Sequence, residues 1–254
     1  MLMLNFPTKK NFSYAPSIFG LLFIWQAAST VYHNYELFPS PVSVCSQLIQ
    51  LFLYQNYIID VIASLKRVLA GFFLAGTAGL LLGVISGINR RLSYAVKPVI
   101  ELFRPIPPIA WIPIAILLFG LGDRPAIFLV FLGAFFPIFS NTYLGVTHVD
   151  AKYIKAAYSL GATMKEIVLH VLIPSSLPSI FTGLKVGLGV GWMAVIAAEM
   201  VGAQSGLGYS IQMNRLLLDI NKVVVGMVTI GVIGALLNLL LDEARRKLIP
   251  WNRT

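Results

Sequence analysis

Charged side chains are scarce in this 254-residue sequence, and acidic ones are scarcer than basic ones. Asp, Glu, Lys and Arg make up 11% of the residues, whereas a typical soluble domain contains about 25%. Hydrophobic residues make up 57%, and the mean hydropathy is +0.82. A chain with so few polar side chains cannot cover a water-exposed globule, so the composition excludes a soluble domain and indicates a membrane protein.

The sequence also lacks the residue patterns of an enzyme. Its one cysteine, Cys45, excludes an intrachain disulfide. No glycine-lysine phosphate-binding motif is present, so the chain is not expected to hydrolyse ATP by itself. His33, His148 and His170 are isolated near the ends of apolar runs, which predicts no metal site and no Ser-His-Asp triad. We therefore expect no catalytic residues and no cofactor bound by this chain.

Long apolar runs dominate what is present, and they predict an all-α membrane protein with one domain over residues 1–254. A helix of about 20 residues crosses a hydrocarbon core of about 30 Å. No small-residue cleavage site follows the first run, so we expect it to be retained. Residues 38–55 open with prolines and then alternate at helical spacing, which predicts a short surface helix. The six predicted membrane helices are 15–33, 61–88, 98–119, 125–146, 177–201 and 222–241.

Basic residues lie at the ends of the apolar runs, which is the pattern of membrane topology and not of a nucleic-acid-binding patch. If the amino terminus is cytoplasmic, the outer side holds only Arg124, Arg215 and Lys222. The inner side then holds the larger set, Lys9, Lys10, Arg90, Arg91, Lys97, Lys152, Lys155, Lys165, Arg245, Arg246, Lys247 and Arg253. This bias predicts that both termini and the loop 147–176 are cytoplasmic.

The loop 147–176 contains a polar, helical segment that interrupts the apolar runs. Asp150 is a suitable N-cap for a first short helix, and Gly161 stands where a left-handed C-terminal cap is expected. Thr163 and Glu166 have the spacing of a capping box for a second short helix, and Pro174 and Pro178 mark the entry into the fifth membrane helix. Two capped helices predict a rigid surface. From the residues alone, a docking surface and a surface loop without a special role both remain open.

The pattern AA-x3-G-x9-V-x-I-P, from Ala156 to Pro174, resembles the EAA loop of ABC importer permease subunits. In that family the loop has the pattern Glu-Ala-Ala, three residues, Gly, nine residues, Ile-x-Leu-Pro. The spacing is the same here, and Val171 and Ile173 are conservative replacements. Lys155 departs from the pattern, because the family has Glu at that position.

The resemblance implies a type I ABC importer fold, in which the loop docks on a separate ATPase subunit that binds ATP and Mg. It also implies a homodimer in the bacterial inner membrane and an extracytoplasmic substrate-binding protein. "SLKRVLAGF", "ELFRPIPPIAWIPIAILLFGLG", "GLKVGLGVGW" and "AAEMVGAQSGLGY" are similar to the branch that imports taurine, alkanesulfonates, nitrate or bicarbonate, and most similar to its taurine members. The residues expected to couple to the ATPase are Lys155, Ala156, Ala157, Leu160, Gly161, Ala162, Glu166 and Pro174.

Ionisable residues inside the apolar runs are candidates for the pathway or its gate, because such residues are costly in a bilayer. Glu199 needs a partner, which Arg67 or Lys66 could supply. A structural ion pair at the gate is favoured over direct substrate contact, since a carboxylate repels an anion. Arg67 could instead attract substrate or extend to the interface, and Lys185 is ambiguous in the same way.

Prolines and tryptophans supply the remaining pathway candidates. Pro107 and Pro108 belong to a run that breaks or kinks a regular helix. Irregular backbone at membrane depth is tolerated where it lines a cavity, so the run predicts a pathway wall or hinge, or else a helix start above the interface. Trp111 and Trp192 are expected mainly in the core. Glycines at four-residue spacing in 61–88 and 177–201 predict close helix packing or a pathway interface.

Two functions of different classes fit these observations. One is the permease subunit of an ATP-driven importer of a small anion. The other is a free-standing secondary transporter or scaffold, which would work without an ATPase and would be expected to carry coupling charges along its spans. Glu199 alone offers little support for such a relay.

Overall fold

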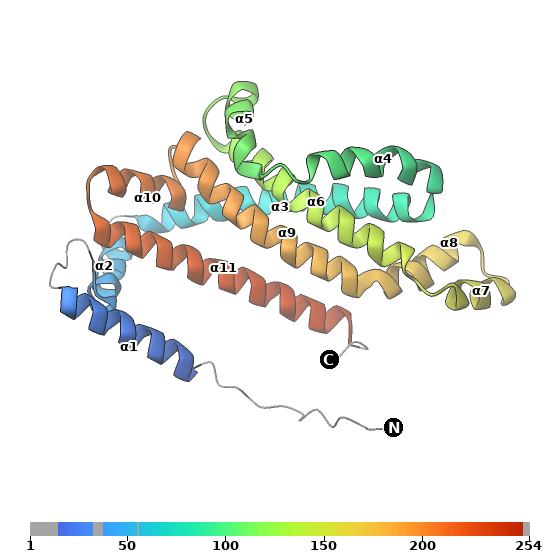
Figure 1. The fold of residues 1–254 in the computed structure, drawn as a ribbon, viewed down its shortest axis with the longest axis horizontal. Helices are drawn as coiled ribbons and strands as arrows, with labels where there is room; N and C mark the ends of the chain where they lie inside the picture. The colour runs from blue at the N-terminus through green and yellow to red at the C-terminus, as the bar shows by residue number, and fades with distance from the viewer. Residues whose placement is uncertain (1–14, 33–37, 55, 251–254) are drawn as a thin grey trace.

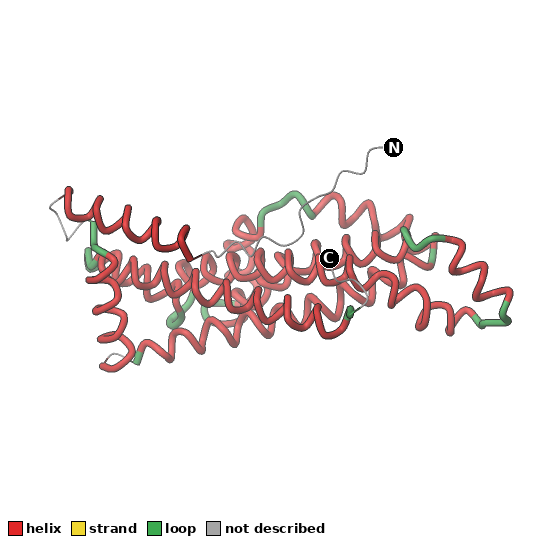
Figure 2. The backbone as a smooth tube through the Cα atoms, turned by 90° about the horizontal axis from the view of Figure 1, so that it is seen from below, coloured by secondary structure: helices red, strands yellow, loops and turns green. Residues whose placement is uncertain are grey.

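A computed structural model describes residues 15–32, 38–54 and 56–250, which are entirely helices, turns and connecting segments without strands. Lys9, Lys10, His33 and Arg253, which contributed to the sequence expectations, lie outside these described residues. The long helices run side by side along the long axis of the molecule, as Figures 1 and 2 show. The chain therefore has the all-α architecture that its apolar runs predict.

Three long helices form the centre of the fold: α3 (Tyr57–Ile88), α6 (Asp123–Thr147) and α9 (Ile173–Gly202). Their glycines allow the backbones to approach closely. A Cβ atom on Gly71 would lie 2.6 Å from the Ile127 carbonyl oxygen, and one on Gly83 would lie 2.7 Å from Thr142 Cβ. A Cβ on Gly187 would likewise lie 2.9 Å from the Ala134 carbonyl oxygen. Of the two interpretations of the glycine pattern, the structure favours close helix packing.

The remaining apolar helices lie around this centre. α11 (Ile220–Leu248) packs along α9, where the Trp192 indole N–H donates to the Ile230 carbonyl oxygen at 3.2 Å. α10 (Leu207–Leu216) connects these two helices at one end of the molecule, where α2 (Pro41–Tyr54) and α1 (Ala15–Tyr32) also lie (Figure 1). The surface helix expected within 38–55 corresponds to α2.

The segment 98–119, which was expected to be one membrane helix with a possible kink, is two helices with a sharp bend. α4 (Arg90–Phe103) begins well before the expected start, capped by the Asn89 side chain. The one-turn η1 (Pro108–Trp111) and α5 (Ile112–Phe119) follow, and the two parts meet at 88°. The prolines that precede η1 and begin it lack backbone donors, so they cannot continue α4 as a regular helix.

The second short helix of the loop is not separated from the membrane helix that follows it. α7 (Ala151–Ser159) is a separate element, but α8 (Met164–Ile167) passes through a π-helical turn, η2 (Val168–Leu172), directly into α9. Pro174 lies in the first turn of α9, where a missing N–H is tolerated, and Pro178 lies inside it, so α9 begins before the expected start at about residue 177. Met164–Gly202 is therefore one continuous 39-residue helical stretch.

Four helical stretches in the described part of the chain are long and apolar enough to cross a membrane: Tyr57–Ile88, Asp123–Thr147, Met164–Gly202 and Ile220–Leu248. The bent pair that contains α4 and α5 would add a fifth span. The apolar part of α1, Phe19–Val31, is shorter than a full span. The expected total of six spans stays a prediction.

Candidate functional site

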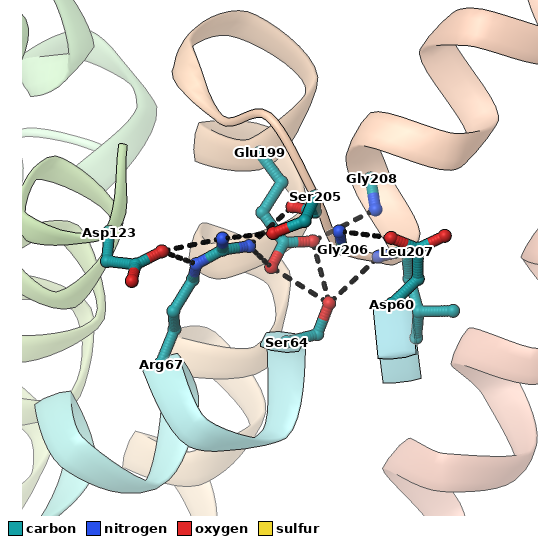
Figure 3. A network of polar contacts seen from close by, with 9 residues as sticks. All are labelled: Asp60, Ser64, Arg67, Asp123, Glu199, Ser205, Gly206, Leu207 and Gly208. Atoms are coloured by element: carbon teal, nitrogen blue, oxygen red, sulfur yellow. Dashed lines mark hydrogen bonds and ion pairs between the residues drawn. The ribbon is translucent and has the colours of Figure 1, made fainter. Parts of the chain in front are cut away.

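A buried polar network joins α3, α6 and α9 at the end of the molecule opposite α7 and α8 (Figures 1 and 3). Arg67 on α3 and Glu199 on α9 form its centre, with 2.7 Å between Arg67 Nη1 and Glu199 Oε1. The two residues are 4% and 1% exposed. The expected pairing of Glu199 with Arg67 is therefore confirmed.

Hydrogen bonds reach both oxygens of the Glu199 carboxylate. Ser64 Oγ lies 2.8 Å from each oxygen, and the Gly208 backbone N–H donates to Oε2 at 3.0 Å. A charge buried this deeply is stable only with such compensation, because removal from water costs several kcal/mol per ion. The geometry favours Glu199 as a structural brace over Glu199 as a substrate contact.

Arg67 connects three separate parts of the chain. Its Nε donates to Asp123 Oδ1 at the start of α6, at 2.7 Å. Its terminal nitrogens donate to the Ser205 carbonyl oxygen at 2.6 Å and to Ser205 Oγ at 2.8 Å. A guanidinium presents its donors in a rigid planar fork, which suits this multiple role. Arg67 thus fixes the turn between α9 and α10 against α3 and α6.

Backbone groups of that turn complete the network. The Gly206 N–H donates to Asp60 Oδ1 at 2.7 Å, and the Leu207 N–H donates to Ser64 Oγ at 2.9 Å (Figure 3). Gly206 has φ of 114°, and a Cβ there would lie 2.5 Å from the Glu199 carboxylate. Only glycine fits this position, since both the backbone conformation and the space exclude a side chain.

The three residues that α3 contributes to this network have a recognisable pattern in the sequence. Asp60, Ser64 and Arg67 are spaced four and three residues apart, so they share one face of a helix. The polar face on an apolar helix indicates a buried polar partner. Asp123 and Ser205 give no such signal, because only the fold brings them to Arg67.

A cavity of about 560 Å³ adjoins the network. Lys66, Arg67, Asp123 and Ser205 line its polar side. The Asp123 side chain is 68% exposed, and Lys66 is also exposed. Charged side chains of the cavity are therefore exposed to solvent, next to the Arg67–Glu199 pair, whose polar atoms already have hydrogen-bond partners. Its other lining residues are Ile59, Ile62, Ala63, Ala70 and Ile127.

The caps predicted for the loop 147–176 are confirmed. The Lys152 N–H donates to the Asp150 side chain at 2.9 Å, and Gly161 has φ of 84° in the left-handed region. The Thr163 N–H donates to Glu166 Oε2 at 2.7 Å, while the Glu166 N–H donates to Thr163 Oγ1 at 3.4 Å. The hydrogen bonds from the Thr163 backbone and side chain lower the pKa of the Glu166 carboxyl, so this cap is charged at neutral pH.

The same loop exposes most of the residues expected to couple to a partner. Lys155, Ala156, Gly161 and Glu166 are exposed, and Leu160 is 88% exposed. Ala157 and Ala162 are half-buried, as is Pro174 at the start of α9. Large apolar side chains that remain in water at such a tip are typical of an interaction surface. The exposed apolar side chains around this tip are Tyr153, Tyr158, Leu160 and Met164.

A buried anchor holds the loop against the membrane helices. Ile167 is fully buried and packs with Val146 at the end of α6 and with Leu172 before α9. Since α8 is also continuous with α9, a force on the loop would reach the spans through packed side chains and an unbroken helix.

The other pathway candidates lie apart from the buried network. Pro107 precedes η1, Pro108 begins it, and the half-buried Trp111 packs against the core. Trp192 is buried, as expected. Lys185 pairs with Asp242 of α11 at 2.7 Å, a partner that the sequence analysis missed. Among the described residues, no cluster of His, Cys, Asp and Glu could hold a metal ion.

Comparisons with known proteins agree on one family. The model of the family described as binding-protein-dependent transport system inner membrane component matches residues 79–254. A relative from Methanocaldococcus jannaschii, named as an ABC transporter permease protein, is 41% identical over 235 residues, covering 91% of this chain and 88% of its own. The taurine transport system permease protein TauC of Escherichia coli is 35% identical over 238 residues, covering 91% of this chain and 86% of its own.

The solved structures agree with this result at the level of the fold. The inward-facing MetNI methionine ABC transporter matches with a TM-score of 0.67 at 23% identity, covering 75% of this chain and 95% of that one. The predicted type I ABC importer fold is therefore confirmed. As in its relatives, the chain is a membrane component of a transporter and not an enzyme. The chain belongs to the binding-protein-dependent transport system inner membrane component family, the permease subunits of ABC transporters.

Proposed function

We propose that this permease forms the membrane part of an ATP-driven importer that moves a small oxyanion into the cytoplasm by alternating access. Two copies form a central pathway, and each presents its loop 147–176 to one ATPase subunit, which binds ATP and Mg. An extracytoplasmic binding protein delivers the substrate. Membership of the family favours this function over a free-standing secondary transporter or scaffold.

The observation that carries the proposal is the rigid, exposed loop with its apolar tip. Leu160 is 88% exposed, and the capping groups at Asp150, Gly161 and Thr163 hold the loop in one conformation. A preorganised apolar surface binds a partner with a smaller loss of conformational entropy than a flexible one. The continuous helix from Met164 to Gly202 then transmits movement of the ATPase to the spans.

The proposed topology places both termini and the loop 147–176 in the cytoplasm, in a bacterial inner membrane. The excess of Lys and Arg on that side supports this orientation. The network around Arg67 then lies near the outer side, where Ser64, Arg67 and Glu199 brace the turn that precedes α10.

The proposed substrate is an oxyanion of the taurine, alkanesulfonate, nitrate or bicarbonate class. The relatives support this class, since they include the taurine permease TauC and a nitrate import permease NrtB from Synechococcus elongatus. The NrtB protein is 34% identical over 200 residues, covering 75% of this chain and 71% of its own.

Gly161→Asp tests the assignment of the loop. A Cβ at Gly161 meets no atom within 4 Å, and Asp is one of the residues that tolerates a left-handed conformation. A side chain at φ +84° carries some backbone strain, but this strain is confined to the exposed loop, so the variant should keep its membrane fold while placing a charged side chain on the docking surface. We expect ATPase activity stimulated by loaded binding protein, and substrate uptake, to fall at least about tenfold in reconstituted vesicles.

The control is the thermal stability and yield of the variant permease in detergent, which should match those of the wild type. A variant that folds normally and also transports at the wild-type rate would exclude this loop as the coupling surface.

A further inference from the structure

A second group of charged residues lies between α9 and α11, away from the network around Arg67. The Lys185 ammonium lies 2.9 and 2.7 Å from the two carboxylate oxygens of Asp242. Arg245, one turn further along α11, lines the same hollow of about 220 Å³. Thr182, whose hydroxyl donates to the Pro178 carbonyl oxygen at 3.0 Å, also lines it, and Phe181, Val186 and Leu241 make the apolar walls.

These charges lie where the apolar part of the membrane helices ends. Residues 223–241 of α11 contain no charged side chain, and at about 1.5 Å per residue they span roughly 28 Å, close to the thickness of a hydrocarbon core. Asp242 is the first charge after this run. Along α9, Lys185 precedes Glu199 by about 21 Å at the same rise. In the proposed topology the hollow therefore lies near the inner boundary of the membrane, far from the network around Arg67.

The hollow contains two cationic side chains but only one carboxylate. Asp242 neutralises one of the two cations, Lys185. Arg245 is half-buried, and no carboxylate among the described residues pairs with its guanidinium. The neighbouring Arg246 and Lys247 instead pair with Glu243. The net charge of the hollow is thus positive by one, and the Lys185 side chain is 47% exposed.

We propose that Lys185 and Arg245 form a weak binding site for the oxyanion of the transported substrate near the inner boundary of the membrane. Arg245 donates to the oxyanion as a planar fork, and Lys185 adds a second cationic donor. Asp242 competes for Lys185 and keeps the affinity low, which permits release into the cytoplasm. This inference rests on the proposed function, since it assigns a site for the same class of substrate.

An alternative source of the same chemistry is the phosphate of an anionic lipid headgroup, which also resides at this boundary. The carboxylate of Asp242 disfavours a tightly held phosphate, whereas a substrate in transit needs only brief binding. The structure therefore favours the transported anion as the occupant, and lipid composition becomes one arm of the experiment.

The experiment measures equilibrium binding of labelled taurine and of nitrate to the permease–ATPase complex in phosphatidylcholine nanodiscs, without binding protein. Arg245→Gln should weaken binding of the preferred anion at least about tenfold, because a charge-assisted hydrogen bond is lost. It leaves no buried carboxylate unpaired, so the variant should fold. Arg246→Gln removes the same charge from the next residue and should leave binding unchanged.

Asp242→Asn distinguishes an anion site from a purely structural Lys185–Asp242 ion pair, because the two predict different changes in anion binding. It frees Lys185 for the anion, so binding should tighten several-fold while the rate of transport falls. A structural pair would give unchanged or weaker binding.

Four outcomes would overturn the proposal. These are no saturable anion binding by the wild type, equal losses in Arg245→Gln and Arg246→Gln, unchanged or weaker binding in Asp242→Asn, and loss of anion binding when phosphatidylglycerol is added to the discs. The last outcome would identify lipid as the occupant. If the complex imports an oxyanion but shows one of these outcomes, only this inference fails; a complex that imports no oxyanion contradicts the proposed function itself.

Discussion

At the scale of single residues, the most consequential side chain is Arg67. It is 4% exposed, and it donates to Glu199, Asp123 and Ser205 from three different parts of the chain. Breaking one partner of a buried ion pair costs more than the pair contributes, because the remaining charge is left without compensation. Removal of Arg67 would leave the buried Glu199 carboxylate without its charged partner.

Arg67→Met should therefore lower the free energy of unfolding by about 3–5 kcal/mol, because it leaves the buried Glu199 carboxylate with neutral donors only. Denaturant titration of the purified permease in detergent measures this change. Asp123→Asn is the matched control: its side chain is 68% exposed, so its loss should cost less than about 1 kcal/mol. Equal losses in the two variants would contradict a central role for the buried pair.

Lys155 is a second residue with a specific expectation. It is exposed on α7, and its positive charge stands where the resembling family has Glu. If the proposed ATPase partner offers a complementary acidic group, Lys155→Glu should reduce ATPase activity stimulated by binding protein several-fold, with the permease fold unchanged. Lys152→Glu, on the same helix but at its start, is the control. An unaffected rate in Lys155→Glu would show that the position is only a solvated edge.

At the scale of elements, the helix contacts depend on where glycine meets a neighbouring backbone. Gly71 faces α6 closely, since a Cβ there would lie 2.6 Å from both the Ile127 carbonyl oxygen and Val130 Cβ. Gly76 lies on the same helix, but a Cβ there meets no atom within 4 Å. The spacing in the sequence does not distinguish these two positions, whereas the packing does.

Gly71→Ala should destabilise the permease by about 1–3 kcal/mol, because the added methyl group forces α3 and α6 apart. Gly76→Ala should be neutral or slightly stabilising, since alanine has the higher helix propensity. Thermal unfolding of the two variants in the same detergent makes the comparison. The packing argument fails if both substitutions have the same effect.

At the scale of the whole molecule, the Arg67 network and the α7–α8 loop occupy opposite ends of a long helical body (Figure 1). The proposed topology places the first outside and the second inside. The continuous stretch Met164–Gly202 reaches from one end to the other, and it carries both the capping box at its start and Glu199 near its end. One element therefore connects the two ends mechanically.

Cysteine labelling tests this orientation. In a Cys45→Ser background, Lys152→Cys should react with a membrane-impermeant maleimide only after the cells are opened, because the Lys152 side chain is 87% exposed on the proposed inner side. Arg215→Cys, exposed at the opposite end, should react in intact cells. The reverse pattern would invert the topology.

Local sequence patterns were enough to predict the membrane class, the helix caps and the helical loop. Charge scarcity and apolar runs are properties of composition, and the caps at Asp150, Gly161 and Thr163 depend on residues within a few positions of one another. The same local logic, applied to Asp60, Ser64 and Arg67, would also have found one side of the buried network. The expected start of the fifth membrane helix at about residue 177 was too late, because Pro174 lies in the first turn of α9, where a missing N–H is tolerated.

Which distant groups meet depends on how the helices pack. The partners Asp123 and Ser205 of Arg67, the pairing of Lys185 with Asp242, and the difference between Gly71 and Gly76 all depend on helices that are remote in sequence. The 88° bend between α4 and the segment of η1 and α5 also depends on packing, since the prolines indicate a break in the helix but not its angle. Local sequence specifies hydrogen bonds within a turn or two of helix, whereas helix packing sets the contacts between elements, and those contacts place the charges of this permease.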